Sequence, residues 1–138
     1  MFNPIVLIPT YNHHIKLLSI IEQIKNYGIN ILIIDDGSDE TTKKALIQIK
    51  EATDADLLTL NKNRGKGAAI KAGVRYVQNQ NYSHCIQIDA DGQHDIDDLP
   101  SIISLARKYP GRMILGNPVF DLLKAPKSRI WGRKISNF

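Results

Sequence analysis

The run IQIDADGQHD, at residues 86–95, sets carboxylates, an amide and an imidazole directly after apolar residues typical of a buried strand. Five of the 14 acidic residues lie at positions 89–98, although the whole chain carries a formal net charge of +4. Carboxylates this close together repel one another unless a cation lies among them. The cluster therefore predicts a site for a positively charged partner.

Oxygen ligands for a divalent metal stand within this run. Asp89 and Asp91 lie two positions apart at the end of the expected strand, so both carboxylates can turn toward one point. Gly92 lets the backbone bend, and Gln93 adds an amide oxygen. Such oxygens suit Mg²⁺ or Mn²⁺, which often take further ligands from substrate phosphates. His94 is a further ligand, a phosphate contact or a turn residue.

The acids that follow have a structural explanation. Asp95, Asp97 and Asp98 precede LPSIISLARK and favour a helix N-terminus through capping and the helix dipole. An EF-hand calcium loop is excluded, because its glycine belongs at the sixth position, whereas Gly92 is the fourth residue counted from Asp89. Only part of the acidic cluster therefore needs a metal.

Two other polar loops are suited to a nucleoside. In PTYNHH, residues 9–14, we expect a wall against a base or a sugar, formed by Pro9, Thr10, Tyr11 and Asn12; His13 and His14 carry no assignment. In DDGSDETT, residues 35–42, an acid such as Asp36 can accept hydrogen bonds from a base N–H or a ribose hydroxyl. The letters DGS also suit an ordinary turn, so this loop has two interpretations.

A further loop, NRGKGAA at residues 63–69, combines Arg64 and Lys66 with glycines at the expected start of a helix. Exposed backbone N–H groups, the positive end of the helix dipole and two cations predict an anion site. The alternative is a glycine-rich turn whose lysine is simply solvated.

The scaffold for these loops is predicted by alternating patterns. Apolar, strand-like runs occupy residues 4–9, 29–35, 56–60, 84–89 and 112–116, and helical patterns occupy residues 14–28, 39–52, 65–80 and 95–111. This alternation predicts an α/β fold, doubly wound and Rossmann-like, with a mainly parallel sheet and helices on both faces. In such a sheet ligands bind beyond the carboxyl ends of the strands, where all four polar loops fall.

Bulk properties limit the functional class. The 138 residues, with 43% hydrophobic and 23% charged residues, are typical of one soluble domain. We find no apolar run of about 18 residues and no signal-peptide pattern, and the single cysteine fits a reducing compartment, so we expect a cytoplasmic protein.

Residues 107–138 carry eight basic residues and one acid, which suits phosphates, an anionic lipid surface or plain solvent. Nucleic acid is not expected, because no recognised binding module is present.

Taken in order, IPTYN, IIDDGSDETT, NRGKGAAIKAG and QIDADGQHD resemble glycosyltransferase family 2, inverting enzymes of the GT-A fold, and within it the branch like dolichyl-phosphate mannose synthase. The resemblance implies a nucleotide-diphosphate sugar as donor, a divalent metal, Mg²⁺ or Mn²⁺, and inversion at the sugar. It places Pro9, Thr10, Tyr11 and Asp36 against the nucleoside, and it assigns the metal to Asp89, Asp91 and Gln93. Arg64 and Lys66 would then neutralise the departing diphosphate.

The resemblance also concerns the acceptor. The segment SRIWGRKISNF, residues 128–138, resembles the part of the polyprenyl-phosphate branch that approaches the acceptor phosphate, which implies contacts from Ser128, Arg129 and Arg133. The alternative is that the apolar residues of this segment pack against a longer chain. His13 stands where that branch commonly has glutamate. We expect residues 1–118 to form the nucleotide-sugar-binding core, and residues 119–138 to begin an acceptor-side segment continuing past Phe138, with the catalytic base and a peripheral membrane contact.

The expected function is therefore transfer of a sugar to a polyprenyl phosphate or another membrane-associated acceptor, at the inner face of the cytoplasmic membrane. Two alternatives stay open. One is a nucleotide-sugar binding module without turnover. The other is a metal-dependent phosphatase of the haloacid dehalogenase type, which resembles D-x-D-G but typically has Thr or Val where Gln93 stands.

Overall fold

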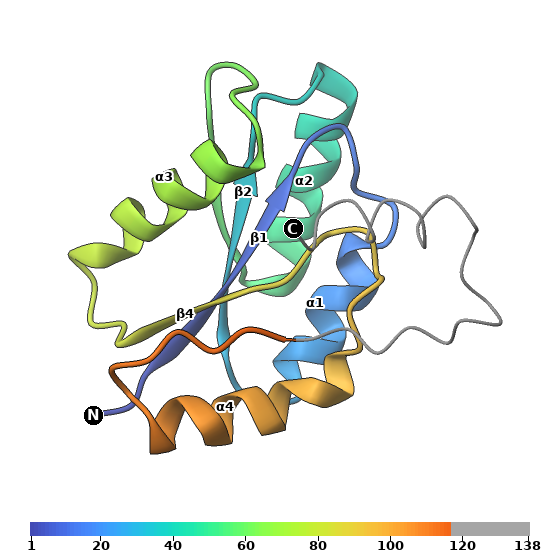
Figure 1. Cartoon of the computed structure of the whole chain (residues 1–138). Coiled ribbons are helices and arrows are strands. Elements are labelled where there is room, and N and C mark those ends of the chain that lie inside the picture. Colours follow the sequence, from blue (N-terminus) through green and yellow to red (C-terminus); the bar gives the residue numbers. More distant parts are fainter. Residues whose placement is uncertain (117–138) are drawn as a thin grey trace, which may run out of the picture.

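The computed structural model describes residues 1–116, which form a four-stranded sheet with helices on both sides (Figure 1). The strands are β1 (Pro4–Thr10), β2 (Asn30–Asp35), β3 (Asp56–Thr59) and β4 (His84–Gln87). The helices are α1 (Leu17–Lys25), α2 (Glu40–Thr53), α3 (Lys66–Gln78) and α4 (Leu99–Lys108), with a 3₁₀ turn η1 (Ile96–Asp98) before α4. Every strand pairing is parallel, which confirms the predicted α/β class.

The strand order β3-β2-β1-β4 makes the sheet doubly wound. The chain moves outward from β1 through β2 to β3, and then crosses back to place β4 on the other side of β1. The direction of winding therefore reverses between β1 and β4. In open parallel sheets a crevice forms at this point, beyond the carboxyl ends of the two strands.

Both faces of the sheet are buried, each under its own helices (Figure 1). Alternate residues of β1, such as Val6 and Ile8, pack toward α1, α2 and α4, whereas Ile5 and Leu7 pack toward α3. A strand covered on both sides needs apolar residues at every position. This explains why β1 and β2 are continuous apolar runs that could be located closely from the sequence.

Helix α3 lies close to the sheet because Gly73 has no side chain. A Cβ atom added at this position would overlap the Ile34 side chain of β2. We expect Gly73→Ala to lower the free energy of unfolding by about 1–3 kcal/mol, as overpacking of a core does. Gly67→Ala on the same helix meets open space, and we expect no loss of stability there. Urea denaturation of the two variants measures the difference, and equal stabilities would mean that α3 moves away from β2 without cost.

The strand predicted at residues 112–116 is not formed, so this prediction is wrong. Helix α4 ends at Lys108, a turn follows, and residues 113–116 have no regular structure. Met113 and Leu115 are 85% and 79% exposed. A run of apolar residues becomes a strand only when its backbone pairs and one face is covered, and within residues 1–116 this run has neither.

Among residues 1–116, no helix has both the length and the apolar character required to cross a membrane.

Candidate functional site

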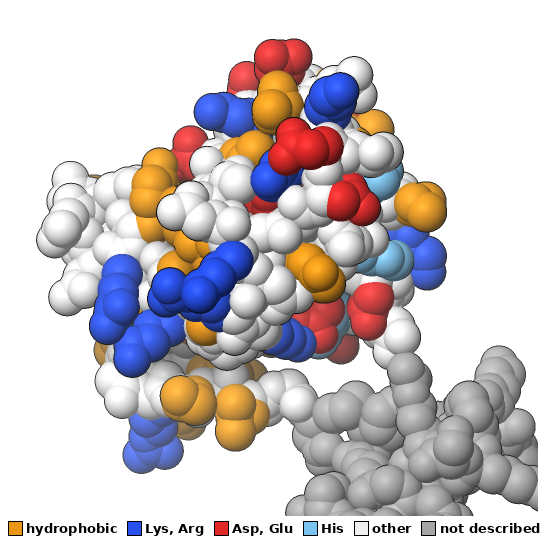
Figure 2. Space-filling view, turned by 90° about the horizontal axis from the view of Figure 1, so that it is seen from above, with side chains coloured by type: hydrophobic (Ala, Val, Ile, Leu, Met, Phe, Trp, Pro, Cys, Tyr) orange, Lys and Arg blue, Asp and Glu red, His pale blue; other side chains and the backbone are white. Residues whose placement is uncertain are grey.

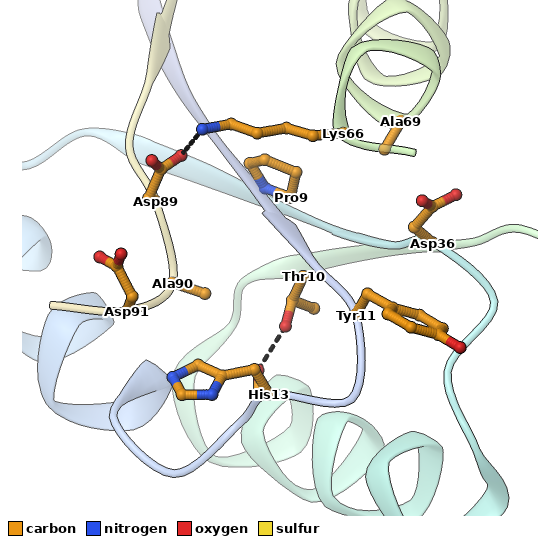
Figure 3. Close-up of a pocket in the computed structure, with 10 residues that line it drawn as sticks. All are labelled: Pro9, Thr10, Tyr11, His13, Asp36, Lys66, Ala69, Asp89, Ala90 and Asp91. Carbon is orange, nitrogen blue, oxygen red and sulfur yellow. Dashed lines mark hydrogen bonds and ion pairs between the residues drawn. The ribbon is translucent and has the colours of Figure 1, made fainter. Parts of the chain in front are cut away.

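A pocket of about 310 Å³ lies at the carboxyl edge of the sheet, where the direction of winding reverses. All four predicted loops contribute to its lining, through Thr10, Tyr11, Asp36, Lys66, Asp89 and Asp91 (Figure 3). Seen from above, this part of the surface carries acidic, basic and histidine side chains next to one another, without a large field of one sign (Figure 2). The pocket can therefore contact a ligand that has both apolar and charged parts.

Asp36 fixes one wall of this pocket. The residue is only 3% exposed, and its two carboxylate oxygens accept hydrogen bonds from the backbone N–H groups of Arg64, at 3.0 Å, and Gly65, at 2.8 Å. The loop after β2 is thus tied to the loop before α3. Carboxylate oxygens have further lone pairs, so Asp36 can also accept a hydrogen bond from a ligand in the pocket.

Asp35, its neighbour, has a different role. This residue is completely buried at the end of β2, and its Oδ1 accepts a hydrogen bond from the Ser38 N–H at 2.9 Å. It does not line the pocket. Of the two consecutive acids, Asp35 shapes the turn, which agrees with the structural interpretation of the DGS loop, and Asp36 lines the pocket, where its contact with a nucleoside stays a prediction.

Asn12 joins the loop after β1 to the loop after β2. Its backbone N–H donates to Ser38 Oγ at 2.9 Å, and its side-chain Oδ1 accepts from the Asp39 N–H at 2.8 Å. Its φ of 49° lies in the left-handed region, which asparagine tolerates better than most residues. The Asn12 side chain is therefore used within the protein and does not line the pocket, whereas Tyr11 beside it does.

Asp39 in turn holds the start of α2. Its side chain accepts a hydrogen bond from the Thr42 N–H at 2.7 Å, as an N-cap residue does. Hydrogen bonds from Thr42 hold the pKa of the Asp39 carboxyl below its usual value. The connected set of Asn12, Ser38, Asp39 and Thr42 holds the backbone on this side of the pocket in place.

Opposite these loops, Lys66 and Asp89 form an ion pair across the pocket (Figure 3). Lys66 Nζ lies 2.5 Å from Asp89 Oδ1, and Gln87 Nε2 donates to the same oxygen at 2.9 Å. His94 Nε2 lies 3.3 Å from Asp89 Oδ2. Partial burial raises the pKa of Asp89, but hydrogen bonds from Lys66, His94 and Gln87 lower it more, so the pKa lies below its usual value. Asp89 is therefore an anion at neutral pH.

Asp91 has a different environment on the same loop. Its Oδ1 accepts the Gln93 N–H at 2.9 Å, and its backbone carbonyl accepts a hydrogen bond from Lys16 Nζ at 3.1 Å. Gly92 beside it has a φ of 71°, and a Cβ there would lie 3.0 Å from Lys16 Cδ. Within the described part of the chain, no lysine, arginine or histidine forms an ion pair with the Asp91 carboxylate.

The residues of this loop fit a divalent metal that takes part of its coordination from a substrate. Residues 1–116 contain no group of three His, Cys, Asp or Glu side chains that could hold a metal by themselves. They do place two carboxylates, Asp89 and Asp91, in one pocket, and a cation, the Lys66 ammonium, already stands against the first. Mg²⁺ is commonly held by one or two carboxylates together with phosphate oxygens, which matches this arrangement.

Comparison with known proteins assigns the chain to a family. Residues 5–127 match glycosyl transferase family 2. The chain belongs to this family. Relatives include the dolichyl-phosphate beta-glucosyltransferase of Dictyostelium discoideum, 32% identical over 75% of this chain and 35% of that protein. Another is the undecaprenyl-phosphate 4-deoxy-4-formamido-L-arabinose transferase of Salmonella choleraesuis, 29% identical over 73% of this chain and 32% of that protein.

A solved structure supports the GT-A fold of this family 2 chain. The chain is similar in structure to glucosyl-3-phosphoglycerate synthase from Mycobacterium tuberculosis, which was crystallised with Mn²⁺, uridine diphosphate and glucosyl-3-phosphoglycerate. The superposition has a TM-score of 0.57 at 18% sequence identity, and it covers 75% of this chain and 39% of the synthase. The chain thus spans about a third of the length of the two family 2 relatives above and 39% of the length of the synthase.

The family 2 chain brings together most of the residues expected at the donor site. Pro9, Thr10 and Tyr11 line the pocket beside Asp36, and Lys66, Asp89 and Asp91 line its other side. Arg64 contributes its backbone N–H to Asp36, and its side chain is absent from the lining. Gln93 donates its N–H to Asp91, and its role as a metal ligand stays a prediction.

Other expectations fall at the edge of this family 2 structure or outside it. Asp95 accepts a hydrogen bond from the Asp97 N–H at 3.0 Å and caps η1, which confirms its expected structural role. Asp98 stands at the N-cap of α4 but makes no side-chain cap bond. The segment 119–138, with Ser128, Arg129 and Arg133, lies outside the described residues.

Several features in and around the pocket of the family 2 chain were not predicted. His13 and Ala90 line the pocket, and Thr10 Oγ1 donates a hydrogen bond to the His13 carbonyl oxygen. Gln87 supports Asp89, and the signal for this contact was present, because residues two apart along an extended chain point to the same side. The contact of Lys16 with Asp91 joins distant parts of the sequence and had no such signal.

Proposed function

We propose that this chain is the sugar-donor-binding part of a metal-dependent, inverting glycosyltransferase whose acceptor is a polyprenyl phosphate or a similar membrane-associated molecule. The observation that carries the proposal is the pocket itself. One side of it, with Tyr11 and Asp36, offers a ring face and hydrogen-bond acceptors, and the other side, with Lys66, Asp89 and Asp91, carries the charges that a metal and a diphosphate need. A nucleotide-diphosphate sugar has the same division into an uncharged base and an anionic diphosphate.

Each side of the pocket has a separate task in this reaction. Tyr11, half exposed at the rim, offers a ring face to a base, and Asp36 offers acceptor oxygens to its N–H groups. Lys66 binds an oxygen of the diphosphate through its ammonium group. Asp89 and Asp91 would hold Mg²⁺ or Mn²⁺, which when bound supplies charge that stabilises the departing diphosphate.

A phosphate acceptor simplifies the proton transfers. In the transfer, the bond from the anomeric carbon to the diphosphate oxygen breaks while a bond to the acceptor oxygen forms on the opposite side. A phosphate monoester is largely dianionic at neutral pH, so its oxygen can attack without losing a proton. The names of two family 2 relatives, which specify dolichyl phosphate and undecaprenyl phosphate, support an acceptor of this class. Contacts to it from Ser128, Arg129 and Arg133, and a location at the inner face of the cytoplasmic membrane, remain part of the proposal.

The test is a transfer assay with the full-length protein. A panel of radiolabelled uridine and guanosine diphosphate hexoses is incubated with undecaprenyl or dolichyl phosphate and Mn²⁺, and the lipid fraction is counted. We expect label to enter the lipid fraction, and to stop entering it when a chelator is added. Binding of the nucleotide without transfer would instead support a binding module, and hydrolysis of simple phosphate esters without nucleotide would support a phosphatase.

A further inference from the structure

Lys66 stands between the two parts of the pocket that a diphosphate and a metal would share. It is the first residue of α3, and its side chain extends from there to Asp89 on the loop after β4 (Figure 3). Its side chain is 53% exposed, while that of Asp89 is 28% exposed. The Lys66 side chain is therefore positioned mainly by its ion pair with Asp89 and little by packing.

This ion pair leaves no simple place for a metal on Asp89. Oδ1 already accepts from Lys66 and Gln87, and Oδ2 faces His94. Mg²⁺ approaches its ligand oxygens to 2.0–2.1 Å, and a dication at that distance would repel an ammonium group 2.5 Å from the same oxygen. Lys66 and a divalent metal therefore compete for Asp89. No such ion pair is made by the Asp91 carboxylate among the described residues, and Lys16 Nζ contacts only the backbone carbonyl of Asp91.

A diphosphate in the pocket would remove this competition. It offers several anionic oxygens near the start of α3, where the helix dipole also favours negative charge. A lysine is a flexible point charge with three N–H groups, so it can exchange one anionic partner for another with little loss of burial. Once Lys66 turns to the diphosphate, Asp89 regains an oxygen for a metal, and the diphosphate supplies further ligands to that metal.

We propose that Lys66 acts as an internal counter-ion that blocks the metal side of Asp89 until the diphosphate of the sugar donor draws it away. Metal and sugar donor then bind cooperatively, and neither binds tightly without the other. Because coupling between two sites is reciprocal, the metal raises the affinity for the diphosphate by the same factor. This inference rests on the proposed function, since it needs a diphosphate ligand.

The test measures metal binding directly, without turnover. Mn²⁺ is titrated into the full-length protein by calorimetry, alone and with saturating uridine or guanosine diphosphate, for the parent, Lys66→Met and Lys71→Met. Lys71 is an exposed lysine of α3 outside the pocket, so its variant loses the same charge elsewhere. For Lys66→Met we expect Mn²⁺ alone to bind about five-fold tighter or more than to the parent, and the nucleotide to add a smaller gain than it does in the parent, because only the phosphate ligands then contribute. We expect Lys71→Met to behave like the parent, whose Mn²⁺ affinity rises at least about five-fold with the nucleotide.

Two failures can be told apart. If Lys66→Met binds Mn²⁺ no tighter than the parent, while the nucleotide still strengthens Mn²⁺ binding in both, the counter-ion role is wrong and the proposed function stands. If the nucleotide has no effect on Mn²⁺ in the parent, the proposed function itself fails. Circular dichroism checks the folding of each variant, and Lys66→Gln, which keeps a polar side chain, is measured with the same criterion in case Lys66→Met does not fold.

Discussion

Asp91→Asn is expected to weaken the Mn²⁺-dependent binding of a nucleoside diphosphate by at least about 10–100-fold, the loss seen when even residues that merely support a metal ligand are changed. The substitution removes little besides charge. Asparagine keeps the Oδ1 that accepts the Gln93 N–H at 2.9 Å, and the backbone carbonyl that contacts Lys16 is unchanged. The loop should therefore stay folded while one carboxylate of the pocket is lost.

Calorimetry with uridine or guanosine diphosphate, in Mn²⁺ and again in excess chelator, measures this loss. Asp95→Asn is the matched control. It removes the same charge four positions further along the chain, and Asp95 caps η1 and does not line the pocket. The control should bind the nucleotide as the parent does when Mn²⁺ is present. If metal-dependent binding survives unchanged in Asp91→Asn, Asp91 is not a ligand of the metal.

Gly37→Ala should cause the largest loss of stability of any single methyl addition in the polar loops. Gly37 has a φ of +73°, and its added Cβ would lie 2.6 Å from the backbone nitrogen of Asn63. A left-handed conformation costs a residue other than glycine about 1–2 kcal/mol. The overlap of the added Cβ with the backbone of Lys62 and Asn63 raises this cost by about 1–3 kcal/mol, because a backbone segment cannot relieve the overlap by rotating a side chain.

Gly28→Ala separates the two effects. Gly28 has a similar φ of +67°, but an added Cβ there meets nothing within 4 Å. Urea denaturation should therefore show a loss of about 1–2 kcal/mol for Gly28→Ala and a clearly larger one for Gly37→Ala. We also expect nucleotide affinity to fall in Gly37→Ala alone, because the loop holding Lys62 and Asn63 leads directly to Lys66. Equal losses would show that the two loops are not in firm contact.

The fold was predictable to the extent that burial dictates the pattern. Strands β1 and β2 and the four helices follow from apolar periodicity, since each buries a surface whose shape repeats along the chain. The run at residues 112–116 has the same composition as a strand but finds no pairing among the described residues, and composition reports hydrophobicity, not partners. Helix ends were less accurate, and α1 covers Leu17–Lys25 within an expected span of residues 14–28.

The site was predictable at the level of loops and less so at the level of contacts. Asp89 and Asp91 stood out because acids two apart after a strand must share one edge of the sheet. The different roles of Asp35 and Asp36 arise because their side chains point in different directions at the end of β2. Asp36 also depends on backbone N–H groups about 28 residues away, at Arg64 and Gly65. The pairing of Lys66 with Asp89 likewise joins two loops whose separation is set only by the folded sheet.

The bonds from Asp36 to the N–H groups of Arg64 and Gly65 limit how this pocket can change during evolution. If Asp36 contacts the base as proposed, a substitution there that alters base preference would also release the loop that carries Lys66. Both losses would follow from a single substitution. Tyr11, whose exposed ring borders the pocket without holding another loop, can be exchanged without this structural cost, so it is the residue at which base preference is freest to change.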